Sequence, residues 1–114
     1  MKKICIVVGS RANYSSIKSA MRAIQAHSEL HLQLVVTASA LLDRYGQVVT
    51  LIEEDGFQIH EKLYILIEGE TPSTMAKSTG IGLIELSSAF ERLLPDIVIT
   101  VGDRFETMAT TLAA

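Results

Sequence analysis

One short stretch, residues 4–24, constrains the fold more than any other part of the sequence. The unbroken apolar run at residues 4–8 is typical of a strand buried on both faces of a parallel sheet. Gly9 and Ser10 then turn the chain, and Asn13 is a candidate N-cap for a helix. The apolar residues that follow recur at spacings of three and four, on one helical face: Tyr14, Ile17, Met21 and Ile24. The stretch therefore predicts a strand, a tight turn and a helix that ends near residues 27–28.

The next segments continue this alternation of strand and helix patterns. Residues 30–36 alternate between apolar and polar side chains, as a strand partly exposed on one face would. Helical spacing follows over residues 41–54, and the Asp-Gly pair at 55–56 is a stop signal. Two short apolar runs come next, at residues 57–59 and 63–67. The pattern leaves open which of these two runs enters the sheet.

A long helix is expected after Thr71, which is a candidate N-cap. Pro72 would occupy the first helical position, where its missing N–H costs nothing. Gly80 and Gly82 indicate close packing, a bend or a loop within this segment, and the Pro-Asp pair at 95–96 ends it. The expected apolar face consists of Leu83, Leu86, Phe90, Leu93 and Leu94.

A second apolar strand is expected at residues 97–101, followed by the turn Gly-Asp-Arg at 102–104. Helical spacing over residues 105–112 then breaks off at Ala114 without a cap signal, which predicts a fragment. Strand and helix alternate about four times, and such alternation requires crossover connections. We therefore expect an α/β fold with a doubly wound parallel sheet, in which residues 1–114 form one incomplete domain.

Composition narrows the class of protein further. The chain has 114 residues and 48% hydrophobic content, which is enough for a core, and no apolar run approaches the roughly 18 residues of a membrane span. The apolar run after the amino-terminal lysines is too short for a signal peptide. We therefore expect a cytoplasmic protein without a membrane partner. The net charge of −3 with scattered basic residues indicates no nucleic-acid partner.

The cysteine and the histidines give no sign of a metal site. Cys5 lies in the first apolar strand, where a thiol is usually a small buried hydrophobe. His27, His31 and His60 lack the spacing of metal ligands, so we expect no zinc site.

Candidate site residues follow the two most apolar strands, which both end in a glycine with an arginine two residues later. Ligands of doubly wound sheets bind beyond the carboxyl ends of the strands, next to helix N-termini. If the crossover that follows the long helix returns to the far side of the first strand, Arg11 and Arg104 converge in one crevice. Two guanidinium groups there suit a diphosphate, and the Ser15 hydroxyl could contribute to the same site.

Each of these residues also has an ordinary structural interpretation. Arg11 could be a solvated surface charge. Asp103 could cap the last helix, with Glu106 in capping-box position, or be a carboxylate held ionised beside Arg104 to orient a substrate or transfer a proton. Glu70 has the same ambiguity between a helix-capping or solvated charge and a site residue.

Several nucleotide-binding classes are disfavoured because their motifs are missing. The chain has no G-x-G-x-x-G after the first strand and no G-x-x-x-x-G-K-[ST] motif. A phosphorylatable receiver domain would need an acidic cluster where this chain has Gly9, Ser10 and Arg11.

Four motifs together resemble those of the hydrolysing UDP-N-acetylglucosamine 2-epimerases of sialic acid biosynthesis. They lie at residues 9–15 (GSRANYS), 45–46 (YG), 67–70 (IEGE) and 95–106 (PDIVITVGDRFE). The resemblance implies the amino-terminal Rossmann-like half of a two-domain fold of the glycosyltransferase-B type. It also implies hydrolysis of UDP-N-acetylglucosamine to N-acetylmannosamine and UDP without a cofactor or metal.

The resemblance also implies roles for individual residues. Arg11, Ser15 and Arg104 would bind the UDP-sugar through the diphosphate or the uracil end, and Asp103 would lie near the sugar as a catalytic candidate. Asn13 stands where that branch usually has aspartate, which leaves any further role of that carboxylate open. The main acid and base groups would lie beyond residue 114, so the 114-residue chain alone is expected to be inactive.

Alternatives within and outside this family stay open. The substrate could be another UDP- or GDP-linked acetamido sugar, or the chain could be a non-catalytic nucleotide-binding module. Members of the family generally associate through this domain, which implies a homo-oligomer, and apolar residues within 75–90 on the long helix are the expected contact.

Overall fold

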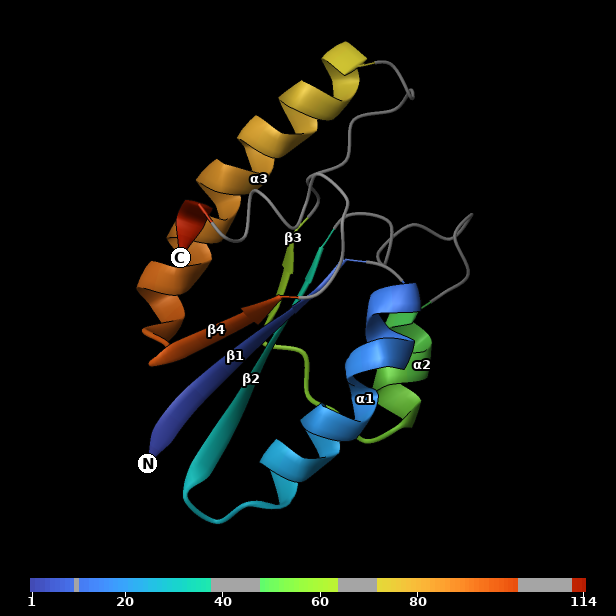
Figure 1. Cartoon of the computed structure of the whole chain (residues 1–114), viewed down its shortest axis with the longest axis vertical. Helices are drawn as coiled ribbons and strands as arrows, with labels where there is room; N and C mark the ends of the chain where they lie inside the picture. Colours follow the sequence, from blue (N-terminus) through green and yellow to red (C-terminus); the bar gives the residue numbers. More distant parts are fainter. Residues whose placement is uncertain (10, 38–47, 64–71, 101–111) are drawn as a thin grey trace.

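The computed structural model describes residues 1–9, 11–37, 48–63, 72–100 and 112–114. Helices and strands alternate along this part of the chain (Figure 1). Their bounds are β1 (Lys2–Val8), α1 (Arg11–Ala26), β2 (Leu30–Thr37), α2 (Val48–Glu54), β3 (Glu61–Leu63), α3 (Pro72–Leu93) and β4 (Ile97–Thr100). In these described ranges, no helix is long and apolar enough to cross a membrane.

The strands form one parallel sheet in the order β3-β2-β1-β4. The chain first moves outward from β1 to β2 and β3, and then returns across the sheet to place β4 on the other side of β1 (Figure 1). In the register, Val7 of β1 lies opposite Thr100 of β4, and Val8 lies opposite Val36 of β2. The predicted doubly wound α/β sheet is confirmed, including the return of the crossover after α3 to the far side of β1.

Hydrophobic residues fill the space on both faces of the sheet. Because strand side chains alternate between faces, Cys5 and Val7 of β1 pack toward α3, whereas Ile6 and Val8 pack toward α1 and α2. Figure 1 shows α3 on one side of the sheet and α1 with α2 on the other. The apolar run of β1 is thus buried on both faces, as predicted.

The exposed face predicted for the second strand is present only in its first half. His31 is exposed and Leu30 and Leu32 are half-buried, but every residue from Gln33 to Thr37 is buried. The carboxyl end of α3 covers this part of the strand, and the Gln33 Nε2 donates a hydrogen bond to the carbonyl oxygen of Leu93 over 2.9 Å. The polar Gln33 side chain can lie in the core because the end of α3 supplies a hydrogen-bond acceptor for its amide group.

The prediction that Asn13 caps α1 is wrong. The helix begins at Arg11, so Asn13 is its third residue, whereas a capping residue lies outside the helix with non-helical backbone angles. The apolar spacing begins only at Tyr14, because Arg11, Ala12 and Asn13 supply no large hydrophobic side chain and so give no signal in the hydrophobic pattern. The predicted end of this helix, near residues 27–28, agrees better with the structure, in which α1 ends at Ala26.

The stop signal after α2 is confirmed. The helix ends at Glu54, and Gly56 has a φ of 91°, a left-handed conformation that glycine adopts at little cost. The earlier part of the predicted helix, residues 41–47, lies outside the described residues.

Neither apolar run between residues 57 and 67 corresponds to β3 as described, which consists of Glu61, Lys62 and Leu63. Only Leu63 belongs to a predicted run, and residues 64–67 lie outside the described residues. β3 borders β2 alone in the described sheet, and a strand with one neighbour needs fewer apolar residues.

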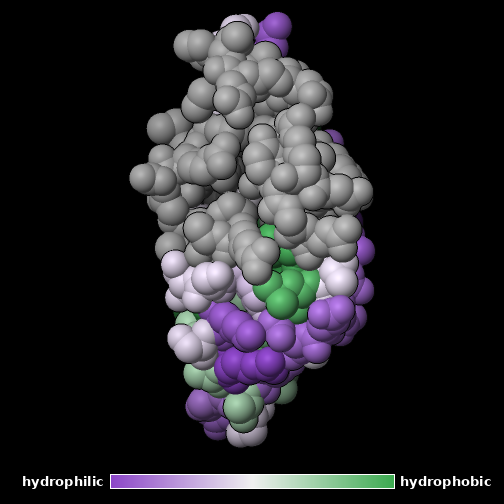
Figure 2. Space-filling model, turned by 90° about the vertical axis from the view of Figure 1, so that its right-hand side faces the viewer, coloured by the Kyte–Doolittle hydropathy of each residue, from purple (hydrophilic) through white to green (hydrophobic). Residues whose placement is uncertain are grey.

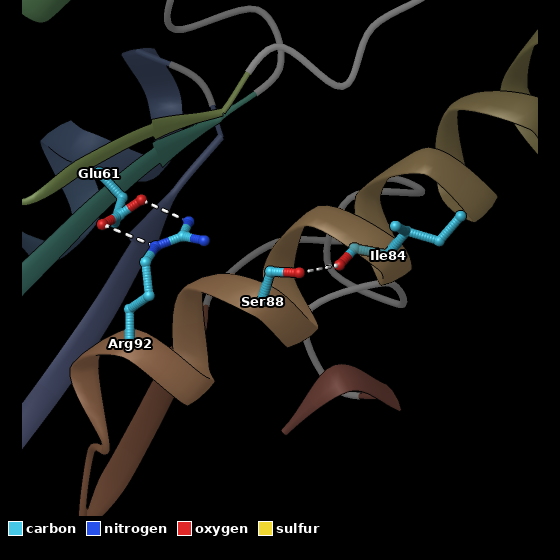
Figure 3. A network of polar contacts seen from close by, with 4 residues as sticks. All are labelled: Glu61, Ile84, Ser88 and Arg92. Carbon is cyan, nitrogen blue, oxygen red and sulfur yellow. Dashed lines mark hydrogen bonds and ion pairs between the residues drawn. The ribbon is translucent and has the colours of Figure 1, made fainter.

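A fork-like ion pair ties β3 to the last turn of α3 (Figure 3). The Nη2 of Arg92 lies 2.6 Å from Oε1 of Glu61, and its Nε donates to Oε2 over 3.3 Å. The Arg92 side chain is half exposed, so the pair fixes the relative position of the two elements more than it adds stability.

The predicted start of α3 agrees with the structure, whereas the predicted apolar face is wrong at the last of its residues. Pro72 is the first helical residue, as predicted, while Thr71 lies outside the described residues. Leu86 and Phe90 are buried as expected, but Leu94 is 66% exposed and does not belong to the apolar face. It lies beyond the helix, with a φ of 48° and its N–H bonded to the carbonyl oxygen of Phe90 over 2.8 Å. The helix continues through Gly80 and Gly82, so neither glycine marks a loop.

The left-handed conformation of Leu94 allows a test of local strain. A side chain with a Cβ costs roughly 1–2 kcal/mol in this conformation, and asparagine tolerates it best among non-glycine residues. We expect Leu94→Asn to raise the free energy of unfolding by up to about 1 kcal/mol. Leu94→Ala keeps a Cβ without the polar side chain and should change stability by less than about 0.5 kcal/mol. Equal stability of the two variants in urea titrations would contradict the strain at this position.

The last elements lie partly outside the described residues. β4 is described from Ile97 to Thr100, and Val101 and most of the predicted final helix are not. β4 is half-exposed, with Ile97 52% exposed, because it borders β1 alone in the described sheet.

Candidate functional site

The carboxyl ends of the parallel strands form the edge where a ligand of this fold would bind. α1 begins three residues after the end of β1, so its N-terminus is at this edge (Figure 1). β1 lies between β2 and β4, because the connections run outward from β1 through β2 to β3 and then back past β1 to β4. This arrangement is the topological switch point of a doubly wound sheet.

Two of the four predicted site residues lie in described elements. Arg11 is the first residue of α1, and Ser15 is exposed on the same helix one turn later. Asp103 and Arg104 lie outside the described residues, as does Glu70. The last residue of β4, Thr100, is paired with Val7, next to the end of β1.

The N-terminus of α1 can attract an anion. A helix of 16 residues presents unpaired N–H groups and the positive end of its dipole at this position. The first turn contains no acidic residue that would neutralise this charge. An aspartate at position 13 would do so, and Asn13 does not.

A buried polar contact holds this end of α1 in place. Tyr14 is 1% exposed, and its hydroxyl donates a short hydrogen bond to Oδ2 of Asp55, just after α2. Lys18, one turn later, forms an ion pair of 2.9 Å with the same oxygen. The Tyr14 ring also meets the Phe57 ring edge to face, with 6.4 Å between the centroids. The position of the α1 N-terminus is thus fixed by the chain that follows α2.

The pKa values around this contact follow from its geometry. Burial, and then the hydrogen bond to Asp55, raise the pKa of Tyr14, so its hydroxyl stays a donor. The hydrogen bonds from Tyr14 and Lys18 lower the pKa of Asp55. Sequence reasoning missed this contact, since it assigned Tyr14 to the core and Asp55 to a helix stop. The available signal was a tyrosine and a lysine four residues apart, on the face that meets an Asp-Gly turn.

The outer face of α1 and α2 is mostly hydrophilic, with one small hydrophobic area (Figure 2). Among the described residues, the large hydrophobic side chains with high exposure lie elsewhere: Met1, Ile84, Leu94, Ile97 and Leu112. The α1 and α2 face is therefore typical of a surface in contact with solvent.

Thr37 is a second residue at the edge that sequence reasoning did not single out. It ends β2, is completely buried, and its hydroxyl has no hydrogen-bond partner within the described part of the chain. A buried hydroxyl usually has a partner. Thr37 therefore adds a possible donor or acceptor to those that Arg11 and Ser15 supply.

The buried thiol of Cys5 does not contribute to the candidate site at the carboxyl ends of the strands. It is completely buried in the core beneath α3, and burial raises its pKa to about 12. The expected role as a small buried hydrophobe is confirmed.

Comparison with sequence families matches residues 22–114 to the profile described as UDP-N-acetylglucosamine 2-epimerase. Two curated relatives match nearly the whole chain. The GDP/UDP-N,N'-diacetylbacillosamine 2-epimerase (hydrolyzing) of Campylobacter jejuni is 33% identical over 95% of this chain. The UDP-N,N'-diacetylbacillosamine 2-epimerase (hydrolyzing) of Legionella pneumophila is 32% identical over the whole chain. The chain spans only 28% and 30% of the lengths of these two relatives.

The fold also matches that of solved structures. A crystal structure of a UDP-N-acetylglucosamine 2-epimerase superposes with a TM-score of 0.83 at 24% identity, over 98% of this chain and 30% of that protein. At this identity the match shows the fold. It agrees with the Rossmann-like sheet and with its place in the amino-terminal part of a glycosyltransferase-B-like protein.

Proposed function

Because the chain belongs to the UDP-N-acetylglucosamine 2-epimerase family, we propose that it is the amino-terminal, nucleotide-binding part of a hydrolysing 2-epimerase. The proposed reaction converts UDP-N-acetylglucosamine and water to N-acetylmannosamine and UDP, for sialic acid biosynthesis. The family and the action of relatives on UDP- or GDP-linked sugars support this proposal. The names of both relatives above specify hydrolysis.

One structural observation carries the proposal: β4 lies directly beside β1. The turns with glycine and arginine at residues 9–11 and 102–104 therefore follow neighbouring strands, as a shared diphosphate site requires. Arg11 at the N-terminus of α1 would then bind the diphosphate together with Arg104. The exposed Ser15 would add a hydrogen bond to the nucleotide.

The chemistry assigns a role to each group. In the proposed first step, a base removes the proton at C2 while the bond from C1 to the UDP oxygen breaks, which leaves a glycal and UDP. Water then adds across the glycal, its oxygen to C1 and a proton to C2. The arginines would stabilise the negative charge that develops on the departing diphosphate. Asp103 would lie near the sugar and orient it or transfer a proton.

We propose that groups outside this chain supply the rest of the acid and base chemistry. The chain spans less than a third of its curated relatives, and a cleft between two domains is the usual place for such a site. The 114-residue chain alone would then be inactive. The enzyme would act in the cytoplasm, without a cofactor.

A homo-oligomer is also part of the proposal, with α3 as the contact. Within the expected range 75–90, Leu86 and Phe90 face the core, whereas Ile84 is 68% exposed. Figure 3 shows the Ile84 side chain pointing away from the sheet. Ile84 is thus the residue on which this contact would depend.

A second candidate substrate is UDP-N,N'-diacetylbacillosamine. The names of the two relatives described above specify this sugar. It shares the UDP group and the acetamido group at C2, so the same residues of this chain would bind the nucleotide. Groups that contact the sugar at C4 would distinguish the two donors.

Turnover of the full-length gene product with each UDP-sugar tests the proposal. With the correct donor we expect equal amounts of UDP and of the free 2-epimerised sugar, N-acetylmannosamine in the first case. In deuterated water the product should carry deuterium at C2, because the proposed intermediate has lost that proton. A product that keeps its UDP would indicate epimerisation without hydrolysis, and no turnover of either donor would contradict the proposal.

A further inference from the structure

His60 bonds to β2 through both its backbone and its side chain. Its backbone N–H donates to the carbonyl oxygen of Leu34 over 2.8 Å, and its Nδ1 accepts from the backbone N–H of Leu34 over 3.1 Å. In an ordinary parallel ladder, a carbonyl of the neighbouring strand would accept that second hydrogen bond. Here an imidazole takes its place. One of the two hydrogen bonds that first link β2 to the chain that enters β3 therefore depends on a titratable side chain.

This hydrogen bond exists only for one form of the imidazole. A ring nitrogen that accepts a hydrogen bond carries no proton, so neutral His60 has its proton on Nε2. Protonation would place a second proton on Nδ1, directly opposite the N–H of Leu34, and two donors cannot bond. The same tautomer argues against a metal ligand here, because coordination at Nε2 would move the proton to Nδ1.

The groups around His60 act on its protonation in both directions, because the backbone of Gln58 favours the protonated form and His31 opposes it. The ring of His31 on β2 meets it edge to face, with 5.7 Å between the centroids, and a second imidazolium there would repel the first. The neighbouring carboxylate of Glu61 on β3 would attract a proton, but it is already paired with Arg92 of α3 over 2.6 Å. The other residues around the small hollow of about 180 Å³ beside His60 are uncharged: Gln25 of α1, Leu30, Leu32 and Gln58.

These contacts give the direction of the titration. Burial, and next the charge of His31, lower the pKa of His60 below its ordinary value, while Gln58 and Glu61 oppose that change. A group with a lowered folded-state pKa that is neutral when buried stabilises the folded form above its unfolded pKa, about 6.5 for histidine. That contribution is lost as the pH falls from there toward the folded-state pKa.

We propose that His60 is a pH-sensitive latch, which holds β3 on the edge of the sheet while its imidazole is neutral and loosens β3 when it is protonated. Within the described residues, β3 forms three registered pairs with β2, so a hydrogen bond at its entrance is a substantial part of the attachment that the structure describes.

Hydrogen exchange at the Leu34 amide tests the latch in the full-length gene product. The exchange rate is measured by mass spectrometry with residue-level fragmentation between about pH 5 and 8. The protection factor is the intrinsic exchange rate at each pH divided by this measured rate. We expect this protection factor to be constant above about pH 6.5 and to fall below it, by up to about tenfold per pH unit. A protection factor that stays constant across the range would overturn the latch.

Two variants separate the latch from a general effect of acid. His60→Asn keeps an acceptor near the position of Nδ1 but cannot titrate, so its Leu34 protection should not depend on pH. His60→Leu lacks the acceptor and should show low protection at every pH. If His60→Asn loses protection at low pH as the wild type does, or if His60→Leu keeps full protection, the proposal is wrong. The readout is amide exchange, so it does not depend on the proposed enzymatic activity.

Discussion

Replacing Arg104 with alanine in the full-length gene product is expected to lower kcat/KM for UDP release by about 100-fold or more. In the proposed reaction, negative charge develops on the diphosphate as the bond to C1 breaks, and removal of one preorganised donor to such a charge costs roughly 10²–10³-fold. Arg104 follows β4 in the sequence, and β4 pairs with β1, the strand that leads into α1. Initial rates of UDP formation at several donor concentrations give kcat and KM separately.

A matched control removes an exposed positive charge that has no part in the proposed site. Lys77 is exposed on α3, and Lys77→Ala should keep kcat/KM within about twofold of the wild type. A loss confined to KM in Arg104→Ala would assign the arginine to binding of the ground state alone. Unchanged kcat/KM in Arg104→Ala would remove Arg104 from the proposed site.

Replacing Leu86 with alanine is expected to lower the free energy of unfolding by about 2–5 kcal/mol. Leu86 is completely buried between α3 and the sheet, in the same cluster as Cys5, Val35 and Phe90. Its truncation removes apolar contacts and leaves a cavity that the rigid strands below cannot fill. Urea titration of the chain, followed by circular dichroism, measures the change in the midpoint and slope.

The control lies two residues earlier on the same helix. Ile84 is 68% exposed, so Ile84→Ala removes a side chain of equal size from solvent and should change stability by less than about 0.5 kcal/mol. If Leu86→Ala costs no more than Ile84→Ala, the packing of α3 on the sheet is not as described. A large effect of Ile84→Ala on self-association, measured by sedimentation, would instead support the proposed contact.

Hydrophobic patterns in the sequence predicted the helices and strands whose buried side chains recur at a regular spacing. The apolar run of β1 and the spacing from Tyr14 to Ile24 each report which side chains leave water, and that depends on neighbours in the sequence. The roles of Gly56 in the stop after α2 and of Pro72 as the first residue of α3 were also predicted. The backbone angles that glycine and proline can adopt are properties of the single residue, so the sequence alone reports them. The predicted Asn13 cap failed because α1 begins before Tyr14, its first large hydrophobic residue.

The candidate site was predictable only in part. The positions of Arg11 and Ser15 follow from the strand, turn and helix pattern, and the order of the strands agrees with the expected crevice. Neither the hydrogen bond from Tyr14 to Asp55 nor the burial of the Thr37 hydroxyl, which has no partner within the described residues, was predicted. Each depends on side chains from segments that lie apart in the sequence, and no local period reports such contacts.

By itself, the sequence determined the alternation of strands and helices, and hence the parallel α/β class, because periods of 2 and 3.6 residues are local properties. Only the tertiary structure decided that β4 lies beside β1, that Gln33 is buried beneath the end of α3, and that His60 replaces a backbone acceptor in the ladder. The physical reason is the same in each case. Burial and hydrogen-bond partners there are supplied by residues 26 to 93 positions away, and hydrophobic periodicity contains no information about them.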